Sequence, residues 1–288
     1  MSRFMGLSVA IQMDNVESLQ IAGDTTFALG LEAQKRGHNL WYYTPDLLSL
    51  NEGTISARGQ DITFYDRVGA HFKTGVKNVK SLQDFDIILM RQDPPFDMAY
   101  ITATYLLEML EPKTMVVNNP TEVRNAPEKL LVTLYPDLIP ATLISRDTEA
   151  IKKFRHKYKD IIVKPLFGNG GAGVFRIQPS DQNLNSLLEM FFCINPEPVI
   201  VQAYLPAVRN GDKRIILVDG NPVGAVNRIP NDGEVRSNFH VGGIAAKANL
   251  TKRELEICDT IGPELSRRGL LFVGIDIIGD YLTEINVT

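Results

Sequence analysis

Ile161-Ile-Val-Lys-Pro-Leu-Phe-Gly-Asn-Gly-Gly-Ala-Gly-Val-Phe-Arg176 is the stretch around which the rest of the sequence is organised. A β-branched apolar run ends at Lys164, a glycine-rich segment follows from Gly168 to Gly173, and a second apolar run begins at Val174. This order predicts a strand, a loop and a second strand. Glycines let backbone amides turn toward an anion without obstruction by a Cβ atom, and Lys164 adds a positive charge at the base of the loop. The stretch therefore indicates a loop that closes over nucleotide phosphates.

Two common phosphate-binding patterns do not fit this loop. A Walker A loop ends in Gly-Lys-Ser or Gly-Lys-Thr, which is missing here. A Rossmann fingerprint leads into a helix, whereas a strand-like apolar run follows this loop. A glycine-rich hairpin without a ligand remains open at this point, because short motifs of this kind also occur by chance. The rest of the chain has to decide between the two interpretations.

The composition is that of a globular protein large enough for about two domains. The chain has 288 residues, of which 44% are hydrophobic and 22% charged, and its formal net charge is -4. No long basic run indicates nucleic acid, and no apolar run approaches the roughly 18 residues that a membrane span needs. The apolar N-terminus breaks at Asp14 and is interpreted as a first strand, not a signal peptide. Cys193 and Cys258 lack metal-binding spacing and indicate reduced thiols in the core of a cytoplasmic protein.

Residues 1–122 alternate strands with helices. We expect strands at 7–13, 40–43, 86–90 and 115–117, helices at 25–36 and 98–110, and a small hairpin at 53–68. This alternation predicts an α/β domain with a parallel sheet, whose ligands gather at the carboxyl ends of the strands. Arg91 and Asp93 lie in a loop at such an end. The alternative for this pair is a loop salt bridge without a role in binding.

A proline-punctuated connection near residue 122 separates this domain from a second one, residues 123–288. In its first part, 123–203, we expect a short helix at 127–134, strands at 141–144 and 199–203, and helices at 147–159 and 181–192. The second part, 204–288, is richer in strands, at 213–218, 222–229, 271–278 and 281–287, with one helix at 251–268. The long polar segment 230–243 is typical of a lid. It contains Asn238 and His240, and a loop histidine is more often incidental than a ligand.

Two carboxylates and an amide near the end of the chain predict a magnesium site. Asp276 lies in an apolar strand, where a carboxylate is costly unless it has a partner. Glu284 and Asn286 are two residues apart and point to one face of the next strand. A turn at Gly279-Asp280 would bring both strands side by side, and such oxygen ligands suit magnesium that carries phosphates. The alternative is a set of solvent-facing residues on an edge strand.

Three arginines, Arg214, Arg228 and Arg236, add anion-binding capacity to the same region. Guanidinium groups bind carboxylates and phosphates through two parallel hydrogen bonds. Together with the glycine-rich loop, Lys164, and Lys129 on the short helix expected at 127–134, they indicate that a nucleotide and an anionic substrate meet on the C-terminal two thirds of the chain. No Ser/His/Asp triad is evident in the sequence.

At this point the residues resemble those of a known family, the bacterial glutathione synthetases of the ATP-grasp superfamily. The resemblance covers essentially the whole chain in order, and its motifs are highly specific when taken together. The motifs are Met90-Arg-Gln-Asp-Pro-Pro-Phe-Asp97, Asn125-Ala-Pro-Glu-Lys-Leu130, Ile162-Val-Lys-Pro-Leu166, Gly168-Asn-Gly-Gly-Ala-Gly173, Tyr204-Leu-Pro206, Gly211-Asp-Lys-Arg214, Asn227-Arg-Ile-Pro230, Glu234-Val-Arg-Ser-Asn238, Phe272-Val-Gly-Ile-Asp-Ile-Ile-Gly-Asp280 and Thr283-Glu-Ile-Asn-Val-Thr288. The implied fold is an N-terminal α/β domain with a parallel sheet, followed by an α+β ATP-grasp domain of two subdomains.

The resemblance implies that one group of residues binds ATP. Lys129 and Lys164 would contact the phosphates, and the loop above them would consist of Gly168, Asn169, Gly170, Gly171, Ala172 and Gly173. The adenine would be held from the segment between the subdomains by Gln202, Tyr204 and Leu205. Asp212 would lie near the ribose.

The resemblance also implies roles for the remaining site residues. Arg214, Arg228 and Arg236 would bind the carboxylates of a dipeptide and the transferring phosphoryl group. Magnesium, or manganese in its place, would be bound by Asp276, Glu284 and Asn286. The Asp93-Pro-Pro loop would face the substrate.

The implied reaction joins γ-glutamylcysteine and glycine. The cysteinyl carboxylate would attack the γ-phosphate of ATP to give an acyl phosphate, and the amine of glycine would then displace phosphate. Such catalysis needs charge neutralisation, positioning and the exclusion of water, which the 230–243 lid would provide. Members of this family tend to assemble as tetramers. The alternatives are another ATP-grasp ligase with a different amino acid or dipeptide, and a catalytically impaired nucleotide-binding homologue.

Two departures from the family pattern concern the second subdomain. The family continues after Asn-Val-Thr with Ser-Pro-Thr, whereas this sequence stops at Thr288. We therefore expect either a longer natural chain or a weakened glycine pocket. In addition, Gly242-Gly-Ile-Ala-Ala246 lacks the charged residues that some members carry after the paired glycines.

Overall fold

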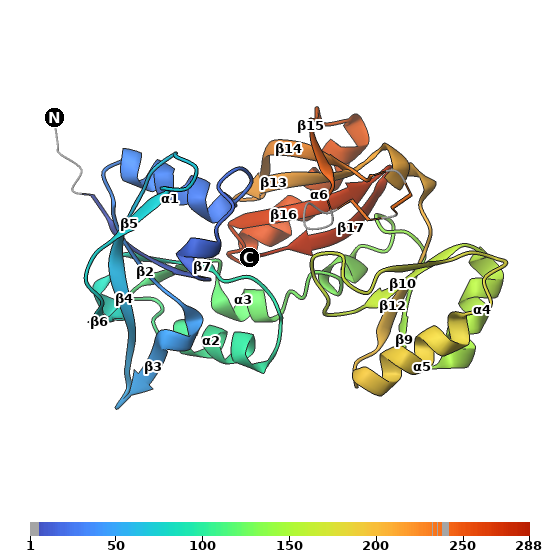
Figure 1. The fold of residues 1–288 in the computed structure, drawn as a ribbon, viewed down its shortest axis with the longest axis horizontal. Coiled ribbons are helices and arrows are strands. Elements are labelled where there is room, and N and C mark those ends of the chain that lie inside the picture. Colours follow the sequence, from blue (N-terminus) through green and yellow to red (C-terminus); the bar gives the residue numbers. More distant parts are fainter. Residues whose placement is uncertain (1–5, 232, 235, 238–241) are drawn as a thin grey trace. The chain divides into compact units, whose positions relative to one another are not determined.

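The fold is described by a computed structural model that covers residues 6–231, 233–234, 236–237 and 242–288. The chain forms two compact units (Figure 1). Unit 1 contains the chain up to Arg124, residues 268–270 and Thr288, and unit 2 contains residues 125–267 and 271–287. The predictions for Asn238 and His240 lie outside the described residues.

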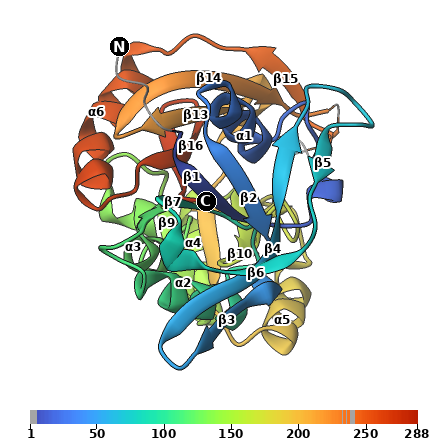
Figure 2. The same ribbon diagram turned by 90° about the vertical axis from the view of Figure 1, so that its left-hand side faces the viewer.

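Unit 1 is built on a mixed sheet with a parallel centre. Strand β1 (Ser8–Met13) pairs in parallel with β2 (Asn39–Tyr43) and with β7 (Ile87–Arg91), and β7 pairs in parallel with β8 (Met115–Val117). With β3 (Leu48–Asn51) and β4 (Thr54–Phe64), the strand order is β3-β4-β2-β1-β7-β8, and Figure 2 shows β1, β2 and β4 next to one another. The predicted parallel sheet is therefore confirmed for the four adjacent strands β2, β1, β7 and β8.

The predicted hairpin at 53–68 is wrong, because strand β4 runs without a turn from Thr54 to Phe64. It pairs antiparallel with β2 and with three short strands, β3 (Leu48–Asn51), β5 (Phe72–Thr74) and β6 (Asn78–Ser81). The turn lies earlier, at Glu52 and Gly53, whose φ angles are 47° and 81°. Glycine adopts a positive φ at little steric cost, which favours the reversal there.

Three helices complete unit 1. Helix α1 (Thr25–Lys35) starts where the carboxylate of Asp24 accepts a hydrogen bond from the Phe27 amide, at 2.8 Å. Phe27 then packs edge-on against Phe64 of β4, so α1 covers the sheet. Helix α2 (Met98–Glu108) is capped in the same way by Asp97, and α3 (Pro120–Arg124) follows β8. Short 3-10 turns occur at Val16–Ser18, Pro45–Leu47 and Leu82–Asp84.

The first part of unit 2 is an antiparallel sheet covered by two helices. Its strands are β9 (Thr142–Ser145), β10 (Ile161–Pro165), β11 (Phe175–Ile177) and β12 (Val199–Ala203), in the order β11-β10-β12-β9. The predicted strand–loop–strand unit is confirmed, since β10 and β11 pair across the glycine-rich segment. Helices α4 (Thr148–Tyr158) and α5 (Leu184–Ile194) supply Ile151, Leu188 and Phe191 to the core.

The helix expected at 127–134 is present only as a 3-10 turn, η4 (Leu131–Leu134). The Pro127 carbonyl accepts hydrogen bonds from the amides of both Leu130 and Leu131, at 2.9 and 3.0 Å. The chain therefore turns tightly after Pro127 before the 3-10 turn begins. Lys129 lies on this preceding turn and not on a helix.

The second part of unit 2 is a five-stranded antiparallel sheet. Its strands are β13 (Asp212–Val218), β14 (Asn221–Ile229), β15 (Ile244–Lys247), β16 (Phe272–Ile278) and β17 (Tyr281–Asn286), in the order β15-β14-β13-β16-β17. Helix α6 (Lys252–Arg267) begins with a reciprocal cap between Thr251 and Glu254. The 3-10 turn η5 (Pro206–Asn210) links the two sheets. None of the helices in the described part of the chain is long and apolar enough to cross a membrane.

Candidate active site

Strand register places the predicted polar residues on one face of the five-stranded sheet. Asp212 pairs with Arg228, Arg214 pairs with Asp276, and Asp276 pairs with Glu284 on its other side. Directly opposed residues of antiparallel strands point to the same face, so these five side chains form a continuous polar strip. The expected turn at Gly279-Asp280 joins β16 and β17 and creates the last of these pairs.

Asp276 is the buried centre of this strip, with a relative exposure of 1%. The Arg214 guanidinium donates to both of its carboxylate oxygens, one of them at 2.8 Å, and Arg228 Nη2 lies 2.9 Å from Oδ1. Burial alone would raise the pKa of Asp276, but the two guanidinium groups outweigh burial and lower it below the ordinary range. Asp276 is therefore ionised at neutral pH, as a metal ligand has to be.

The pKa of Asp212 is shifted in the opposite direction from that of Asp276, although Arg228 Nη2 lies 2.7 Å from Asp212 Oδ2. Burial and the nearby charge of Asp276 raise the pKa of Asp212 to about 6, and Arg228 only partly counteracts them. The hydroxyl of Ser237 donates to the same Oδ2 atom at 2.9 Å. The 230–243 segment thus reaches the polar strip through Ser237.

Two lysines meet the glycine-rich loop beside Glu284. Lys164 Nζ lies 3.4 Å from Glu284 Oε1, and Lys129 Nζ lies 3.8 Å from the same oxygen. Lys129 also donates to the carbonyl oxygen of Gly168, the first glycine of the loop. Residues that are far apart in the sequence are thereby brought together: two cations, one carboxylate and a loop that is rich in glycine.

Glu128 is a member of this cluster that the sequence analysis did not single out. Its carboxylate accepts a hydrogen bond from Lys129. The side-chain amide of Asn286 is assigned the orientation in which its nitrogen donates to Glu128 Oε2 at 3.0 Å and its oxygen accepts from Arg214 Nη2 at 3.3 Å. Burial and the charge of Glu284 raise the pKa of Glu128 to about 7, against the effect of Lys129. The only sequence signal was an acidic residue directly before Lys129.

Gly274 is a second residue that sequence reasoning missed, and it makes room for Arg214. A Cβ atom at this position would lie 3.0 Å from Arg214 Cδ. Gly274 pairs with Asn286 on β17, so it occupies the same face as the polar strip. A glycine within an apolar strand is a general sign of close approach by another group, but the sequence does not say which group approaches.

The glycine-rich loop and the described part of the 230–243 segment are in contact. Gly170, Gly171 and Gly173 have positive φ angles of 62°, 81° and 69°, which glycine adopts readily. The carbonyl of Gly171 accepts a hydrogen bond from Arg236 Nη1 at 3.3 Å, and Arg236 Nη2 lies 2.6 Å from Glu234 Oε2. Within the loop, the Ala172 amide donates to the Asn169 carbonyl at 3.2 Å.

The segment expected to hold adenine is fixed at both of its ends. Gln202 is buried, and its side-chain amide donates to Thr142 Oγ1 at 3.0 Å. The Tyr204 amide donates to the carbonyl of Asp160 at 3.0 Å, and the Leu205 carbonyl accepts from the Val208 amide at 3.1 Å. The segment thus runs from the end of β12 into η5 with a defined conformation.

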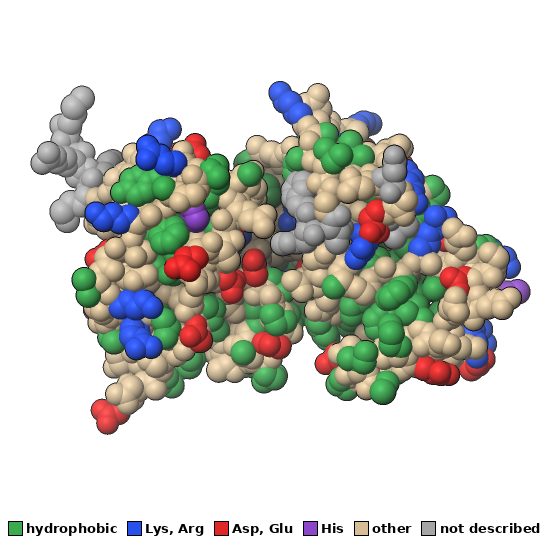
Figure 3. Space-filling model, in the orientation of Figure 1, with side chains coloured by type: hydrophobic (Ala, Val, Ile, Leu, Met, Phe, Trp, Pro, Cys, Tyr) green, Lys and Arg blue, Asp and Glu red, His purple; other side chains and the backbone are tan. Residues whose placement is uncertain are grey.

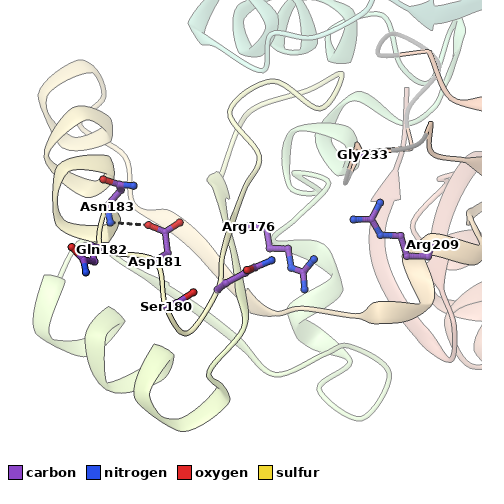
Figure 4. Close-up of a pocket in the computed structure, with 8 residues that line it drawn as sticks. Arg176, Ser180, Asp181, Gln182, Asn183, Arg209 and Gly233 are labelled. Atoms are coloured by element: carbon purple, nitrogen blue, oxygen red, sulfur yellow. Dashed lines mark hydrogen bonds between the residues drawn. The ribbon is translucent and has the colours of Figure 1, made fainter.

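An open, polar pocket of about 670 Å³ lies next to this segment. Figure 4 shows Arg176 and Arg209 extending toward one another from opposite sides, with Gly233 above and the chain around Ser180 to Asn183 beside them. Figure 3 shows several Lys and Arg side chains on the face of unit 2 that is drawn there. The pocket favours anionic or polar ligands over apolar ones.

In unit 1, hydrogen bonds join the first part of the Arg91–Asp97 loop to the end of β1 and to the start of α1, and Asp97 caps α2. Arg91 donates to Thr25 Oγ1 at 2.8 Å and to Thr26 Oγ1 at 3.1 Å. The Asp93 amide donates to a carboxylate oxygen of Asp14 at 2.7 Å. These contacts hold the loop at the carboxyl ends of β1 and β7.

The donor set on the five-stranded sheet fits a hard divalent cation. In the part of the chain that the structure describes, no group of three or more His, Cys, Asp and Glu side chains gathers as a metal cluster. The predicted site has a different composition, with two carboxylates on paired strand positions and the amide of Asn286, which lies 3.5 Å from Asp276 Oδ2. Oxygen ligands of this kind match magnesium or manganese and not a thiol-bound metal.

The fold is that of the ATP-grasp ligases. Among solved structures, D-cycloserine synthetase DcsG aligns with a TM-score of 0.68 at 15% identity, covering 97% of this chain and 91% of that chain. The ATP-grasp ligase PsnB, complexed with the precursor peptide PsnA2 and AMPPNP, aligns with a TM-score of 0.61 at 16% identity over 98% of this chain and 90% of that chain. Identities this low show the shared fold alone.

Sequence comparison gives the particular family. The model of the prokaryotic glutathione synthetase N-terminal domain matches residues 7–124, and the model of its ATP-grasp domain matches residues 128–288. The chain is 58% identical to a glutathione synthetase of Brucella melitensis over 99% of this chain and 91% of that protein. It is 42% identical to one of Pseudomonas putida over 99% of this chain and 90% of that protein. The chain therefore belongs to the prokaryotic glutathione synthetase family and is an ATP-dependent ligase.

Proposed function

We propose that this enzyme joins γ-glutamylcysteine to glycine and forms glutathione, ADP and phosphate. The observation that carries the proposal is the convergence of Lys129, Lys164, the Gly168 carbonyl and Glu284 within unit 2. Such a cluster suits the γ-phosphate of ATP, where negative charge is largest and has to be neutralised before another anion can attack. The high identity to glutathione synthetases supports this choice of substrates.

In the first step, an oxygen of the cysteinyl carboxylate attacks the γ-phosphorus of ATP. A bond forms between that oxygen and phosphorus, the bond from phosphorus to the bridging oxygen of ADP breaks, and ADP leaves. Lys129 and Lys164 hold the phosphates in position, and their charge reduces the repulsion between the two anions. The product is an acyl phosphate, whose phosphate is a far better leaving group than oxide.

In the second step, the uncharged amine of glycine attacks the acyl carbon, the bond from that carbon to the phosphate oxygen breaks, and the departing phosphate takes up the proton that the amine loses. Water competes with glycine for the acyl phosphate, so the site has to be covered during the reaction. We assign this covering role to the 230–243 segment. Its described residues already contact the glycine-rich loop through Arg236 and the polar strip through Ser237.

The three predicted arginines divide into two kinds within this mechanism. Arg228 has a side chain only 5% exposed and lies between Asp212 and Asp276, so we assign it the role of keeping these carboxylates in place. Arg214 and Arg236 have side chains that are 27% and 31% exposed. We assign these two the binding of substrate carboxylate and transferring phosphoryl group, which guanidinium groups bind well.

We further propose that Asp276, Glu284 and Asn286 hold magnesium, with manganese as an alternative. When bound, the cation supplies charge neutralisation at the phosphates. Asp276 and Glu284 are opposed on paired strands, which keeps their carboxylates on one face. Arg214 and Arg228 keep Asp276 ionised, so it is ready to bind a cation without first losing a proton.

The decisive experiment measures phosphate release with magnesium, ATP and γ-glutamylcysteine, with and without glycine. We expect release that depends on the dipeptide and on magnesium and that becomes rapid when glycine is added. Release with a different dipeptide or amino acid, and none with γ-glutamylcysteine, would identify another ATP-grasp ligase. Nucleotide binding without release for any carboxylate substrate would identify an impaired homologue.

Assembly and compartment are also proposals. We propose a homo-oligomer, in the form of a tetramer, and sedimentation equilibrium of the purified chain would test it directly. We propose the reducing cytoplasm as its location, since Cys193 and Cys258 are both free thiols. Recovery of the enzyme outside the cytoplasmic fraction of its own cells would contradict this. Cys258 is buried as expected, whereas the expectation of a core position is wrong for Cys193, which is exposed on α5.

A further inference from the structure

Arg176 makes a double contact that the mechanism above does not use. It lies on β11, directly after the glycine-rich loop. Its Nε and Nη2 atoms donate to the two carboxylate oxygens of Asp160 at 3.1 and 2.6 Å. Its Cζ atom lies 3.7 Å from the centroid of the Tyr204 ring. One guanidinium group therefore forms a bidentate ion pair and a cation–π contact at the same time.

The same partners are also joined through the backbone. The Tyr204 amide donates to the Asp160 carbonyl at 3.0 Å. Asp160 directly precedes β10 and Tyr204 directly follows β12, and the neighbouring residues Ile161 and Ala203 pair with each other. Ile161 pairs on its other side with Ile177 of β11. Arg176 on β11 thus contacts the residue before β10 and the residue after β12, at the end of the sheet where the chain leaves β12.

This arrangement restricts the Tyr204 ring more than either contact alone. A planar guanidinium that is held by two carboxylate oxygens has little freedom to rotate. The ring that lies against its face is restricted in turn, because the backbone of Tyr204 is tied to the same residue, Asp160. A group that is already ordered loses less conformational entropy when a ligand binds against it.

We propose that Arg176, together with Asp160, is a positioning residue for the nucleotide base. The pair holds Tyr204 and the start of the Tyr204–Leu205 segment in the conformation that accepts adenine. This inference rests on the proposed use of ATP and takes the Tyr204–Leu205 segment as the base-binding one, as the family resemblance implies. It predicts an effect on nucleotide affinity and not on the chemical step, since Arg176 touches neither the lysines nor the polar strip in the contacts described above.

Arg176 can be replaced without opening the core. Its side chain is 23% exposed, and Figure 4 shows it extending into the open pocket opposite Arg209. Arg176→Lys keeps the positive charge but loses the planar, bidentate group. Asp160→Asn removes the carboxylate that holds the guanidinium and leaves the Asp160 backbone carbonyl in place.

The test is the affinity for ADP with magnesium, measured by titration calorimetry on the full chain. This measurement needs neither γ-glutamylcysteine nor glycine, so it is independent of the substrate assignment. We expect Arg176→Lys and Asp160→Asn each to weaken ADP binding by about three- to tenfold. The Kd of the double variant for ADP should lie within about twofold of the Kd of the weaker single variant, because both substitutions act through the Tyr204 ring. In turnover, KM for ATP should rise by a similar factor with kcat nearly unchanged.

Arg146→Lys is the matched control. Arg146 also stacks on an aromatic ring, that of Phe192 on α5 at 4.5 Å, and donates to the backbone carbonyl of Asn195 at 2.6 Å. It should leave ADP affinity unchanged. Wild-type affinity in Arg176→Lys would overturn the proposal, as would an equal loss in Arg146→Lys or a fall in kcat without loss of affinity. Should Arg176→Lys fail to fold, Asp160→Asn alone decides in the same way. Lack of phosphate release in the wild type would overturn the proposed function instead.

Discussion

Glu284 links the two lysines of the phosphate cluster to the polar strip of the five-stranded sheet. Its Oε1 atom lies 3.4 Å from Lys164 Nζ and 3.8 Å from Lys129 Nζ, and its strand position is opposite Asp276. We expect Glu284→Gln to reduce kcat by about a hundredfold or more, because a neutral amide binds a divalent cation more weakly than a carboxylate and does not balance the charge of two ammonium groups. Turnover is measured as a function of magnesium concentration at saturating ATP.

Asp280→Asn serves as the control for this substitution. Asp280 lies in the turn between the same two strands, and its backbone carbonyl, not its carboxylate, accepts a hydrogen bond from Arg253. Its turnover should match that of the wild type. A Glu284→Gln enzyme with an unchanged rate at limiting magnesium would refute the assigned role.

Asp212 gives the native state a pH dependence of a definite sign. Its pKa is raised to about 6 in the folded chain, above the value of about 3.9 for an ordinary aspartate. The native state therefore binds this proton more tightly than the unfolded state. The resulting destabilisation is present above about pH 6 and is relieved as the pH falls toward about 4. Asp276 has a lowered pKa and stays largely ionised between pH 5 and 7 in both states, so it adds little over that range.

The measurement compares the free energy of unfolding of the wild type and of Asp212→Asn. Between about pH 7 and about pH 5, the wild type should gain about 1 kcal/mol relative to the variant. Contributions common to both proteins, such as that of Glu128, cancel in the difference. Urea unfolding at the two pH values provides both numbers, and a difference independent of pH would contradict the raised pKa.

At the scale of elements, helix α6 packs closely against the turn between β13 and β14, where Gly262 of the helix meets Gly220 of the turn. A Cβ atom at Gly262 would lie 2.2 Å from the Gly220 carbonyl oxygen, and one at Gly220 would lie 2.5 Å from the Gly262 carbonyl oxygen. Both obstacles are backbone atoms, which cannot turn aside as a side chain does. We expect Gly262→Ala to lower the free energy of unfolding by about 1–3 kcal/mol.

Gly224→Ala is the matched control in the neighbouring strand β14. Nothing lies within 4 Å of a Cβ atom built at Gly224, and its φ angle is not positive. This variant should be as stable as the wild type or slightly more stable, because alanine restricts the unfolded chain. Equal stability of the two alanine variants in urea would show that the helix shifts freely on the turn.

Most elements of unit 2 were predictable because apolar and β-branched residues recur in them between clear turn signals. The strands β10, β12, β13, β14, β16 and β17 begin and end within about two residues of the expectation, as strongly periodic segments usually do. Strand β15, Ile244–Lys247, was not expected. Its residues are largely exposed and it pairs only with β14. An edge strand of this kind is defined by its partner and leaves little pattern in its own sequence.

The residue types of the candidate site could be predicted from the sequence, but the contacts between their side chains could not. The residue types at Lys164, Asp276 and Glu284 indicated cations and oxygen ligands for a nucleotide. Whether Arg214 contacts Asp276 depends on the register of β13 against β16, which the sequence does not specify. Glu128 was missed for a similar reason, since its position beside Asn286 results from the pairing of distant segments.

At the scale of the whole molecule, the chain consists of two units with separate sheets and cores. All residues assigned to the phosphates, the base and the metal belong to unit 2. A ligand that binds only the native state stabilises the part of the structure that holds it, by about 2.7 kcal/mol at 100 times its Kd. Nucleotide binding should therefore slow amide hydrogen exchange in unit 2 and not in unit 1.

This difference is measured by hydrogen exchange with and without Mg·ADP. We expect protection to increase along 161–177 and 272–286, where amide exchange should slow by up to about a hundredfold. The strands of unit 1, β1, β2 and β4, should exchange as before. The increase should be lost in Lys164→Met, which removes one phosphate cation next to Glu284. Lys80→Met on unit 1, whose amine pairs with Asp61, is the control and should retain it. Nucleotide-dependent protection that falls mainly on β1, β2 and β4 would place the base and phosphates in unit 1 and would invalidate the site described for unit 2.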